Sequence, residues 1–375
     1  MILKRCLKWT RKEVKRALLY NWFSSINSLE IFKYISFRSC LAAFTAFLIS
    51  IIFGYLFIKK LRTLKVGEDT TKTDSVEIKR MHFDKKNTPT MGGIVINISI
   101  LVSALFWCNV YNEYVLLMMF TLIWFGALGF IDDYIKLTQK NAAGLSDVSK
   151  LLFQSALGLI LGLVLYFHFS KFTWGTQLVI PFVKDFRPDI GPFYILAVAF
   201  FIVGMSNAVN LTYGLDGLAI GCSIIAGIAF TAIAYASGRV DFSNYLRIPY
   251  VPGSGELSVF CAALVGGSLG FLWYNCFPAQ VFMGDTGSLT LGGLLGLVAI
   301  IVKQELLMVI IGGIFVAEVV SVLVQKFFYK MTKRRVFRCA PLHHHFQFKG
   351  WPETKITLRF CIIAAMLAVF SLILL

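Results

Sequence analysis

The stretch Phe125-Gly-Ala-Leu-Gly-Phe-Ile-Asp-Asp-Tyr-Ile-Lys136 decides the fold, because it joins a long apolar run to a group of charges. Residues 114–131 carry no charge, and the run ends in Asp132 and Asp133. An apolar helix that brings two adjacent carboxylates to its end indicates either a functional site or a charged helix end that reaches into the water layer. The stretch alone leaves both interpretations open.

Two lysines follow these carboxylates. Lys136 and Lys140 stand four and eight residues after Asp132, so a continuing helix places all three on roughly one face. Adjacent carboxylates repel each other, and positive charge is therefore expected around them. A divalent metal that carries phosphate groups would suit this arrangement.

The composition is that of an integral membrane protein. Hydrophobic residues make up 57% of the 375 residues and charged residues only 15%, whereas soluble proteins carry nearer a quarter. The eight cysteines are scattered and form no CxxC pair. The net charge of +16 fits the positive-inside bias of a polytopic membrane protein, and phosphate or anionic lipid ligands, better than nucleic acid.

The predicted fold class is all-α, a polytopic membrane protein of two parts. Residues 1–38 are expected to form a basic amphipathic segment on the membrane surface, and residues 39–375 a domain of ten transmembrane helices. The predicted spans are 39–58, 91–110, 114–131, 151–170, 191–211, 214–236, 257–275, 286–302, 304–328 and 356–375.

The loops predict which way the spans run. Lysine and arginine are concentrated in the loops between spans 1 and 2, 3 and 4, and 9 and 10, whereas the opposite loops hold six in total. The positive-inside rule therefore makes the first set of loops cytoplasmic and puts both termini outside. The unusual polar clusters all fall on the predicted cytoplasmic side, although the basic N-terminus runs against this orientation.

Four clusters follow from this reading. Lys85 and Thr90 precede the second span beside Pro89 and two glycines, a plausible phosphate site at a helix N-terminus or simply a capped helix start. The junction 206–217 carries Asn210 and Asp216 at a glycine-broken helix end, where polar groups are costly in lipid unless they line a watery cavity.

The third cluster lies at the junction 275–289. Asp285 stands between Gly284 and Gly287 at a helix start, where a carboxylate can hold a metal and free backbone N–H groups can face phosphate. A simple helix cap is the alternative. In the fourth cluster, consecutive histidines 343–345 cannot all point one way, so contacts with phosphate or sugar fit better than a zinc site.

Together these stretches resemble the polyprenyl-phosphate N-acetylhexosamine-1-phosphate transferases. The motifs are FIDDYIK (130–136), NLTYGLDGLAIG (210–221), FPAQVFMGDTGSLTLGG (277–293) and APLHHHFQFKGWPE (340–353). The last motif resembles the one that separates the UDP-MurNAc-pentapeptide branch from relatives that use other hexosamines. The resemblance runs from about Tyr20 to the C-terminus, with one departure: Tyr213 stands where the family usually has aspartate.

The resemblance implies a reaction. Undecaprenyl phosphate would attack the β-phosphorus of UDP-MurNAc-pentapeptide with Mg²⁺ as cofactor, which releases UMP and forms lipid I. The protein would lie in a bacterial inner membrane with its site facing the cytoplasm. The resemblance leaves open whether it forms a homodimer. By resemblance Asp285 is the metal ligand, while Asp132 and Asp133 handle the lipid phosphate as base or second metal contacts. The other implied substrate-binding residues are Lys85, Thr90, Lys136, Lys140, Asn210, Tyr213, Gly214, Leu215, Asp216, Asn275, Phe282, Ser288, His343, His344 and His345.

Two rival functions remain at this point. A relative that uses UDP-GlcNAc would share most of these motifs. A secondary transporter could also have ten spans with polar broken helices, although its site is expected near the midplane of the membrane and between inverted repeats.

Overall fold

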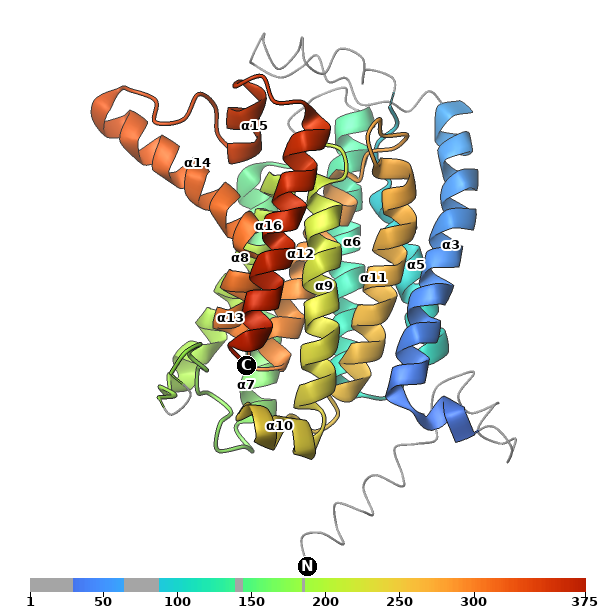
Figure 1. Ribbon diagram of the computed structural model, residues 1–375, viewed down its shortest axis with the longest axis vertical. Helices are drawn as coiled ribbons and strands as arrows, with labels where there is room; N and C mark the ends of the chain where they lie inside the picture. The colour runs from blue at the N-terminus through green and yellow to red at the C-terminus, as the bar shows by residue number, and fades with distance from the viewer. Residues whose placement is uncertain (1–29, 64–87, 139–143, 184–185) are drawn as a thin grey trace, which may run out of the picture.

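The computed structural model describes residues 30–63, 88–138, 144–183 and 186–375, and this part of the chain is all-helical. Its one extended pairing is an isolated bridge between Gln177 and Asp189. The helices run roughly parallel to one long axis and form a bundle (Figure 1). The predicted all-α membrane fold is confirmed.

Eight helices in the described residues are long and apolar enough to cross a membrane. They are α3 (Ile35–Thr63), α6 (Glu113–Thr138), α7 (Asp147–Phe169), η4 with α8 (Gly191–Phe193 and Tyr194–Thr212), α9 (Leu218–Ser237), α11 (Gly255–Asn275), α12 (Gly284–Ile301) and α16 (Glu353–Ile373). A further apolar helix, α5 (Gly93–Trp107), stands where the second span was predicted. Its 15 residues rise about 22 Å, less than a bilayer core of about 30 Å.

The predicted span 304–328 is not one continuous helix. It consists of two helices, α13 (Glu305–Ile311) and α14 (Gly313–Thr332), that meet at an angle of 84°. The break falls at Gly312-Gly313, where neither residue has a side chain to restrict the backbone. As a result α14 leaves the bundle sideways (Figure 1).

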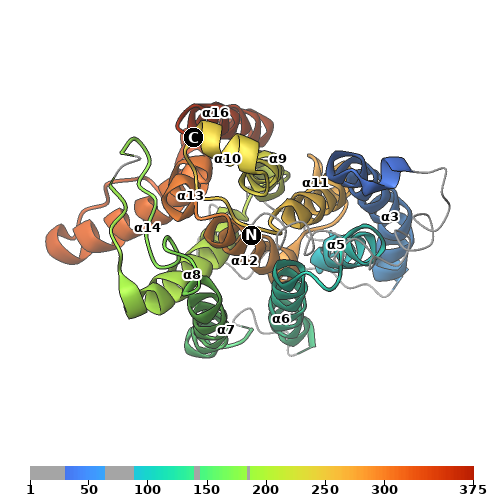
Figure 2. The same ribbon diagram turned by 90° about the horizontal axis from the view of Figure 1, so that it is seen from below.

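Helix α12 is the centre of the bundle. Every residue from Gly284 to Ile301 is buried, and the view along the bundle shows α12 surrounded by the other helices (Figure 2). Its glycines allow close contact: a side chain at Gly292 would meet the backbone of Met205, and one at Gly293 would meet the ring of Phe125. Small residues at helix contacts are typical of membrane bundles, because they let backbones approach.

Two short helices complete the chain. Helix α10 (Val240–Leu246) lies between α9 and α11, and α15 (Leu342–Gln347) lies between α14 and α16. Helix α3 begins, and α16 ends, at the same end of the bundle as α10, while α15 lies at the opposite end (Figure 1). The chain therefore crosses the bundle an even number of times between the start of α3 and the end of α16. A 3-10 turn, η1 (Glu30–Lys33), precedes α3, and most of the predicted surface segment 1–38 lies outside the described residues.

Candidate active site

Three buried carboxylates meet where α6 ends and α12 begins. Asp132 and Asp133 lie near the end of α6, and Asp285 is the second residue of α12. One oxygen from each lies within 4.8 Å of the others, and all three residues are buried. Because α6 and α12 pack along much of their length, the bundle itself holds the three acids together.

Two lysines bridge Asp132 and Asp285. Lys136 follows Asp132 by one helical turn, and its Nζ lies 2.6 Å from Asp132 Oδ2 and 3.2 Å from Asp285 Oδ2. Lys150, in the first turn of α7, places its Nζ 2.7 Å from Asp285 Oδ2 and 3.1 Å from Asp132 Oδ1. The predicted pairing of Asp132 with Lys136 on one face of a helix is confirmed. We call these five residues (Asp132, Asp133, Lys136, Lys150, Asp285) the acidic cluster.

The acidic cluster has more acid than base. Among the described residues, three carboxylates face two ammonium groups, which leaves one negative charge in excess in a largely buried place. A buried carboxylate that no cation balances is costly even when it accepts hydrogen bonds, so a cation is expected to join the group. Carboxylate oxygens are the ligands that Mg²⁺ prefers, and the donor set therefore fits that ion.

Asp133 plays a different part from Asp132. Its Oδ1 accepts a hydrogen bond from the backbone N–H of Asp285 at 3.0 Å. Its Oδ2 accepts from the backbone N–H of Thr286 at 3.0 Å and from the Thr286 hydroxyl at 2.6 Å. Asp133 thus caps the start of α12 from another helix, satisfying N–H groups that have no partner within α12.

Gly284 makes this cap possible. It has a φ of +71°, and a side chain at this position would collide with the carboxylate of Asp133. The glycine before Asp285 in the motif therefore has a structural reason: it brings the Asp133 carboxylate onto the helix end.

Asp132 is tied to the loop before α7. Its Oδ1 accepts a hydrogen bond from the backbone N–H of Leu145 at 2.8 Å. Both oxygens of Asp132 therefore contact groups, the two lysines and Leu145 N, that a substrate phosphate or a metal could displace. The two adjacent aspartates consequently differ in chemistry, as their 100° separation on a helix predicts.

The segment before α5 fastens onto the start of α12. Phe282 N donates to Pro89 O at 2.8 Å, Gly92 N to Phe282 O at 2.8 Å, and Gly93 N to Met283 O at 2.7 Å. Thr90 is buried within this contact between residues 89–93 and 282–283. A side chain at Gly93 would strike the backbone of Gly287, so the paired glycines permit the contact.

The junction between α8 and α9 lies against the junction between α11 and α12. Asp216 Oδ2 accepts from Ala279 N at 3.0 Å, and Asn275 Oδ1 accepts from Gly217 N at 3.2 Å. Ser288, one turn into α12, donates its hydroxyl to Asn210 Oδ1 at 3.3 Å. The structure therefore brings these sequence-predicted residues together around the start of α12.

Tyr213 ends α8 and leads into Gly214 and Leu215. Its backbone N–H bonds to the carbonyls of Val209 and Asn210, and its side chain is half-buried against the core. A side chain at Gly214 would collide with the ring of His343, which brings the histidine motif beside this loop.

The three histidines point to different partners. His343 is buried, with Nδ1 3.2 Å from Glu318 Oε1, and its backbone N–H donates to the same oxygen. His344 Nδ1 lies 2.7 Å from Gln347 Oε1. The expectation that the histidines cannot all point one way is thus confirmed.

His345 faces the turn after α14. Its Nδ1 accepts a hydrogen bond from the backbone N–H of Arg338 at 3.1 Å. Partial burial, together with the charges of Lys349 and Arg338, lowers the pKa of His345 below its usual value. The three histidine contacts described here are made within the protein, so contacts with a sugar-phosphate remain a prediction.

Sequence reasoning missed Lys150 and Thr286. A lysine in the first turn of an apolar helix is disfavoured by the helix dipole, and this signal could have drawn attention to Lys150. Thr286 lies inside a motif that was quoted, but its bond to Asp133 depends on contacts between helices. Lys85 and Lys140 lie outside the described residues.

Comparison with known families agrees with this geometry. Residues 115–303, about half of the chain, match glycosyl transferase family 4. Residues 85–96, which include the segment that bonds to the start of α12, match signature 1 of the phospho-N-acetylmuramoyl-pentapeptide-transferases. The family match spans all five residues of the acidic cluster. The chain therefore belongs to glycosyl transferase family 4, as a membrane-embedded phospho-sugar transferase that carries the phospho-N-acetylmuramoyl-pentapeptide-transferase signature.

Proposed function

We propose that the protein transfers phospho-MurNAc-pentapeptide from UDP-MurNAc-pentapeptide to undecaprenyl phosphate, giving lipid I and UMP. The observation that carries the proposal is the acidic cluster, in which three buried carboxylates and two lysines meet at one end of a membrane bundle. The signature at residues 85–96 supports this substrate over other nucleotide sugars.

The proposed phosphoryl transfer needs positive charge and carboxylates, and the acidic cluster supplies both. An oxygen of the lipid phosphate attacks the β-phosphorus of the nucleotide sugar. The bond from that phosphorus to the oxygen bridging it to the α-phosphorus breaks, and UMP leaves with that oxygen. Both substrates are anions, so the reaction depends on positioning and on neutralising charge. Lys136 and Lys150 supply positive charge beside Asp132 and Asp285, and substrate phosphates can take the place of one carboxylate at each ammonium group.

Asp132 is the carboxylate best placed to act on the lipid phosphate. It holds both lysines, and its bond to Leu145 N is the one hydrogen bond to backbone that its side chain makes among the described residues. Asp133 supports the site indirectly, since it fixes the start of α12 and with it Asp285. Asp285 and Asp132 would hold Mg²⁺, which when bound supplies charge neutralisation at the pyrophosphate.

The position of the acidic cluster suits one lipid and one water-soluble substrate. The cluster lies at a helix end rather than at the middle of the bundle, so the isoprenoid chain can stay in the membrane while the nucleotide stays in water. The distribution of lysine and arginine supports a cytoplasmic location for this end. A homodimer is compatible with the proposal and is not required by it.

The test is UMP release by the purified full chain with undecaprenyl phosphate and Mg²⁺, with UDP-MurNAc-pentapeptide or UDP-GlcNAc supplied separately. The proposal expects UMP and a lipid-linked muramoyl product from the first donor and little from the second. The Asp285→Asn variant is the control for contaminating activity. Release from UDP-GlcNAc alone would assign the protein to another branch, and substrate uptake into proteoliposomes without any UMP would favour a transporter.

A further inference from the structure

The C-terminal part of the chain carries far more basic than acidic charge. Residues 319–375 contain nine lysines and arginines but one acid, Glu353. Glu353 Oε1 accepts a hydrogen bond from the backbone N–H of Asp216 at 2.6 Å, so this oxygen points toward the junction between α8 and α9. The basic residues of this part of the chain therefore have little acid of their own segment to balance them.

Two stacked aromatic rings lie where α15 leads into α16. The ring centres of Phe346, in α15, and Trp351, just before α16, are 4.7 Å apart, and the ring planes differ by 24°. The backbone N–H of Trp351 donates to Phe346 O at 3.2 Å, which fixes the turn between them. Phe346 also meets the buried ring of Phe360, on α16, edge to face at 5.9 Å. The ring pair is thus held firmly against the first turns of α16.

Three exposed cations lie over these rings. Arg359 Cζ is 4.5 Å and Lys355 Nζ 5.1 Å from the centre of the Trp351 ring, and Lys349 Nζ is 5.6 Å from the centre of the Phe346 ring. None of the three forms an ion pair with a carboxylate of the described residues. Lys355 and Arg359 stand four residues apart on α16, where like charges repel, so an anion between them is favourable. We call the five residues (Phe346, Lys349, Trp351, Lys355, Arg359) the Trp351 patch.

The Trp351 patch lies at the boundary of the membrane. It is at the end of the bundle that carries α15 (Figure 1), the end that we propose to be cytoplasmic. Arg359 stands six residues after the start of α16, about 9 Å along the helix axis. Its guanidinium group nevertheless lies over Trp351, which precedes the helix, because long basic side chains lean toward the helix start and reach for water. Tryptophan is typical of the headgroup layer, so the cations lie at the depth of phospholipid phosphates.

The same face of α16 is apolar beyond the cations. Ile362, Met366 and Phe370 follow Arg359 by three, seven and eleven residues, which places them on its side of the helix, and all three are exposed. No charged residue follows Arg359 in the chain. This face therefore matches a molecule with an anionic head and hydrocarbon chains, whereas an acidic peptide would match the cations alone.

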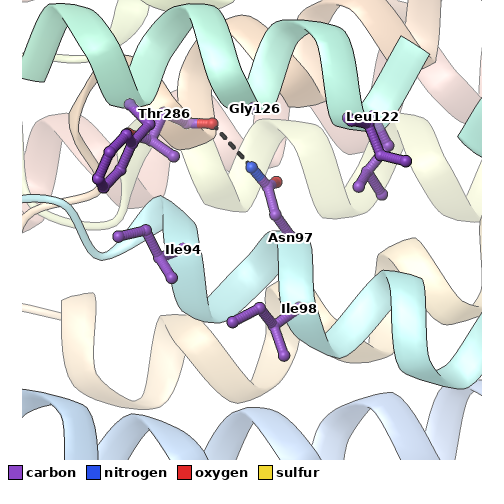
Figure 3. Close-up of a pocket in the computed structure, with 8 residues that line it drawn as sticks. Ile94, Asn97, Ile98, Leu122, Gly126 and Thr286 are labelled. Atoms are coloured by element: carbon purple, nitrogen blue, oxygen red, sulfur yellow. Dashed lines mark hydrogen bonds between the residues drawn. The ribbon is translucent and has the colours of Figure 1, made fainter. Parts of the chain in front are cut away.

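The hollow between α5 and α6 shows how a lipid-facing surface without such selection differs (Figure 3). No charged residue is among those that line it. Asn97 Nδ2 donates to Thr286 O at 3.1 Å, and Asn97 Oδ1 is enclosed without a hydrogen-bond partner among the described residues. The polar atoms of Asn97 therefore face the protein, whereas the cations of the Trp351 patch are open to a ligand.

We propose that the Trp351 patch, with the face of α16 beyond it, binds an anionic glycerophospholipid of the phosphatidylglycerol type. Arg359 donates paired hydrogen bonds to the phosphate, Lys355 adds a second positive charge, and the acyl chains lie along Ile362 and Met366. The lipid substrate of the proposed reaction is a different molecule at a different place. Its phosphate must reach the acidic cluster on α6, α7 and α12, and Figure 2 shows α16 on the opposite side of the bundle from α6 and α7.

The probe is phosphatidylglycerol with a photoreactive diazirine in one acyl chain, added as a small fraction to phosphatidylcholine nanodiscs that hold the full chain. Labelled peptides are mapped by mass spectrometry. The signal is the labelling of 353–373 divided by that of 194–212, a membrane helix without lysine or arginine. We expect this ratio to be at least about tenfold higher than with the same probe built on phosphatidylcholine, because each cation near an anionic headgroup adds to binding.

A double variant and a matched control separate the patch from general positive charge. Lys355→Gln with Arg359→Gln should lower the ratio to that of the phosphatidylcholine probe. Lys326→Gln with Lys330→Gln removes the same charge at the same spacing from exposed positions on α14 that contact no aromatic ring, and should change the ratio less than twofold. Arg359→Lys keeps the charge and loses the paired donors, so an intermediate ratio is expected.

Three results would overturn the proposal. The first is an equal ratio for the two probes in the unmodified protein. The second is a fall in the α14 control as large as in the α16 double variant, which would mean attraction by overall charge. The third is labelling that undecaprenyl phosphate displaces and unlabelled phosphatidylglycerol does not. The experiment measures binding alone, so its result is independent of whether the protein transfers phospho-sugars.

Discussion

Two groups of buried charges lie at opposite ends of the bundle, and they are built differently. The acidic cluster joins three carboxylates to two lysines whose side chains remain 28% and 16% exposed. At the other end Lys303, between α12 and α13, pairs with Glu305, and both side chains are almost fully buried. Among the described residues, the acidic cluster has unequal numbers of opposite charges and is partly open to water, whereas the Lys303–Glu305 pair is balanced and closed.

The Lys303 group has the features of a structural support. Lys303 Nζ lies 3.3 Å from Glu305 Oε1, donates to Gly175 O at 3.1 Å, and sits 4.1 Å from the centre of the Tyr194 ring. The Tyr194 hydroxyl donates to the same Glu305 oxygen at 3.0 Å. Burial lowers the pKa of Lys303, and its ion pair with Glu305 opposes that effect.

The difference teaches how to separate function from stability in this bundle. The closed pair ties Gly175, in the segment after α7, to the core, and removing one member should destabilise the fold without changing the chemistry. An open cluster with excess charge is ready to take a cation and anionic substrates, and changing it should alter the chemistry more than the fold.

The largest expected effect is on Asp285. Asp285→Asn keeps the shape of the side chain and removes the charge that holds both lysines, so we expect kcat for UMP release to fall by about 10²–10³-fold. The apparent melting temperature should change little. Near-wild-type kcat at saturating Mg²⁺ would remove Asp285 from the reaction.

The Lys303 pair gives the converse prediction. Lys303→Met leaves Glu305 buried without its partner, which typically costs about 3–5 kcal/mol of unfolding free energy. We expect that loss in denaturant unfolding in detergent, with kcat per folded molecule within about twofold of wild type. Lys171→Met, at an exposed lysine near the same end, is the matched control. A large fall in kcat with unchanged stability would contradict the contrast between the two groups.

The adjacent aspartates should separate as well. Asp133→Asn weakens the cap of α12 and should cost about 1–2 kcal/mol of stability together with some activity. Asp132→Asn should lower kcat with little effect on stability, because its partners are mostly the two lysines. Unfolding and kcat are measured for both variants in one detergent. Equal and mild losses would mean that the pair is only a charged helix end.

The smallest expected effect concerns Tyr213. If its ring stacks on the uracil, Tyr213→Ala should raise KM for the nucleotide sugar by about five- to tenfold and leave kcat nearly unchanged, because stacking acts in ground and transition states alike. Tyr213→Phe should keep most of the affinity. A lower kcat at unchanged KM would exclude a role limited to binding.

Sequence alone predicted the parts that depend on local order. The uncharged run before Asp132 predicted α6, and spacing of four residues predicted the pairing with Lys136. The glycines around Asp285 predicted a specialised helix start. These features need only neighbours in the chain, so a helix period is enough to find them.

The missing parts depend on contacts between helices. Lys150 reaches Asp285 because α7 returns beside α6, and the cap from Asp133 exists only once α12 docks there. The break at Gly312 was missed because a glycine pair within an apolar run is also compatible with a straight membrane helix. The unpartnered oxygen of Asn97 is likewise visible only when α5, α6 and α12 are together.

The most direct test of the unbalanced cluster is its need for a divalent cation. UMP release by the purified full chain with UDP-MurNAc-pentapeptide and undecaprenyl phosphate is measured in EDTA and then across a Mg²⁺ titration. The excess negative charge at Asp132, Asp133 and Asp285 predicts almost no release in EDTA and saturable recovery with Mg²⁺. Full release in EDTA would contradict the account.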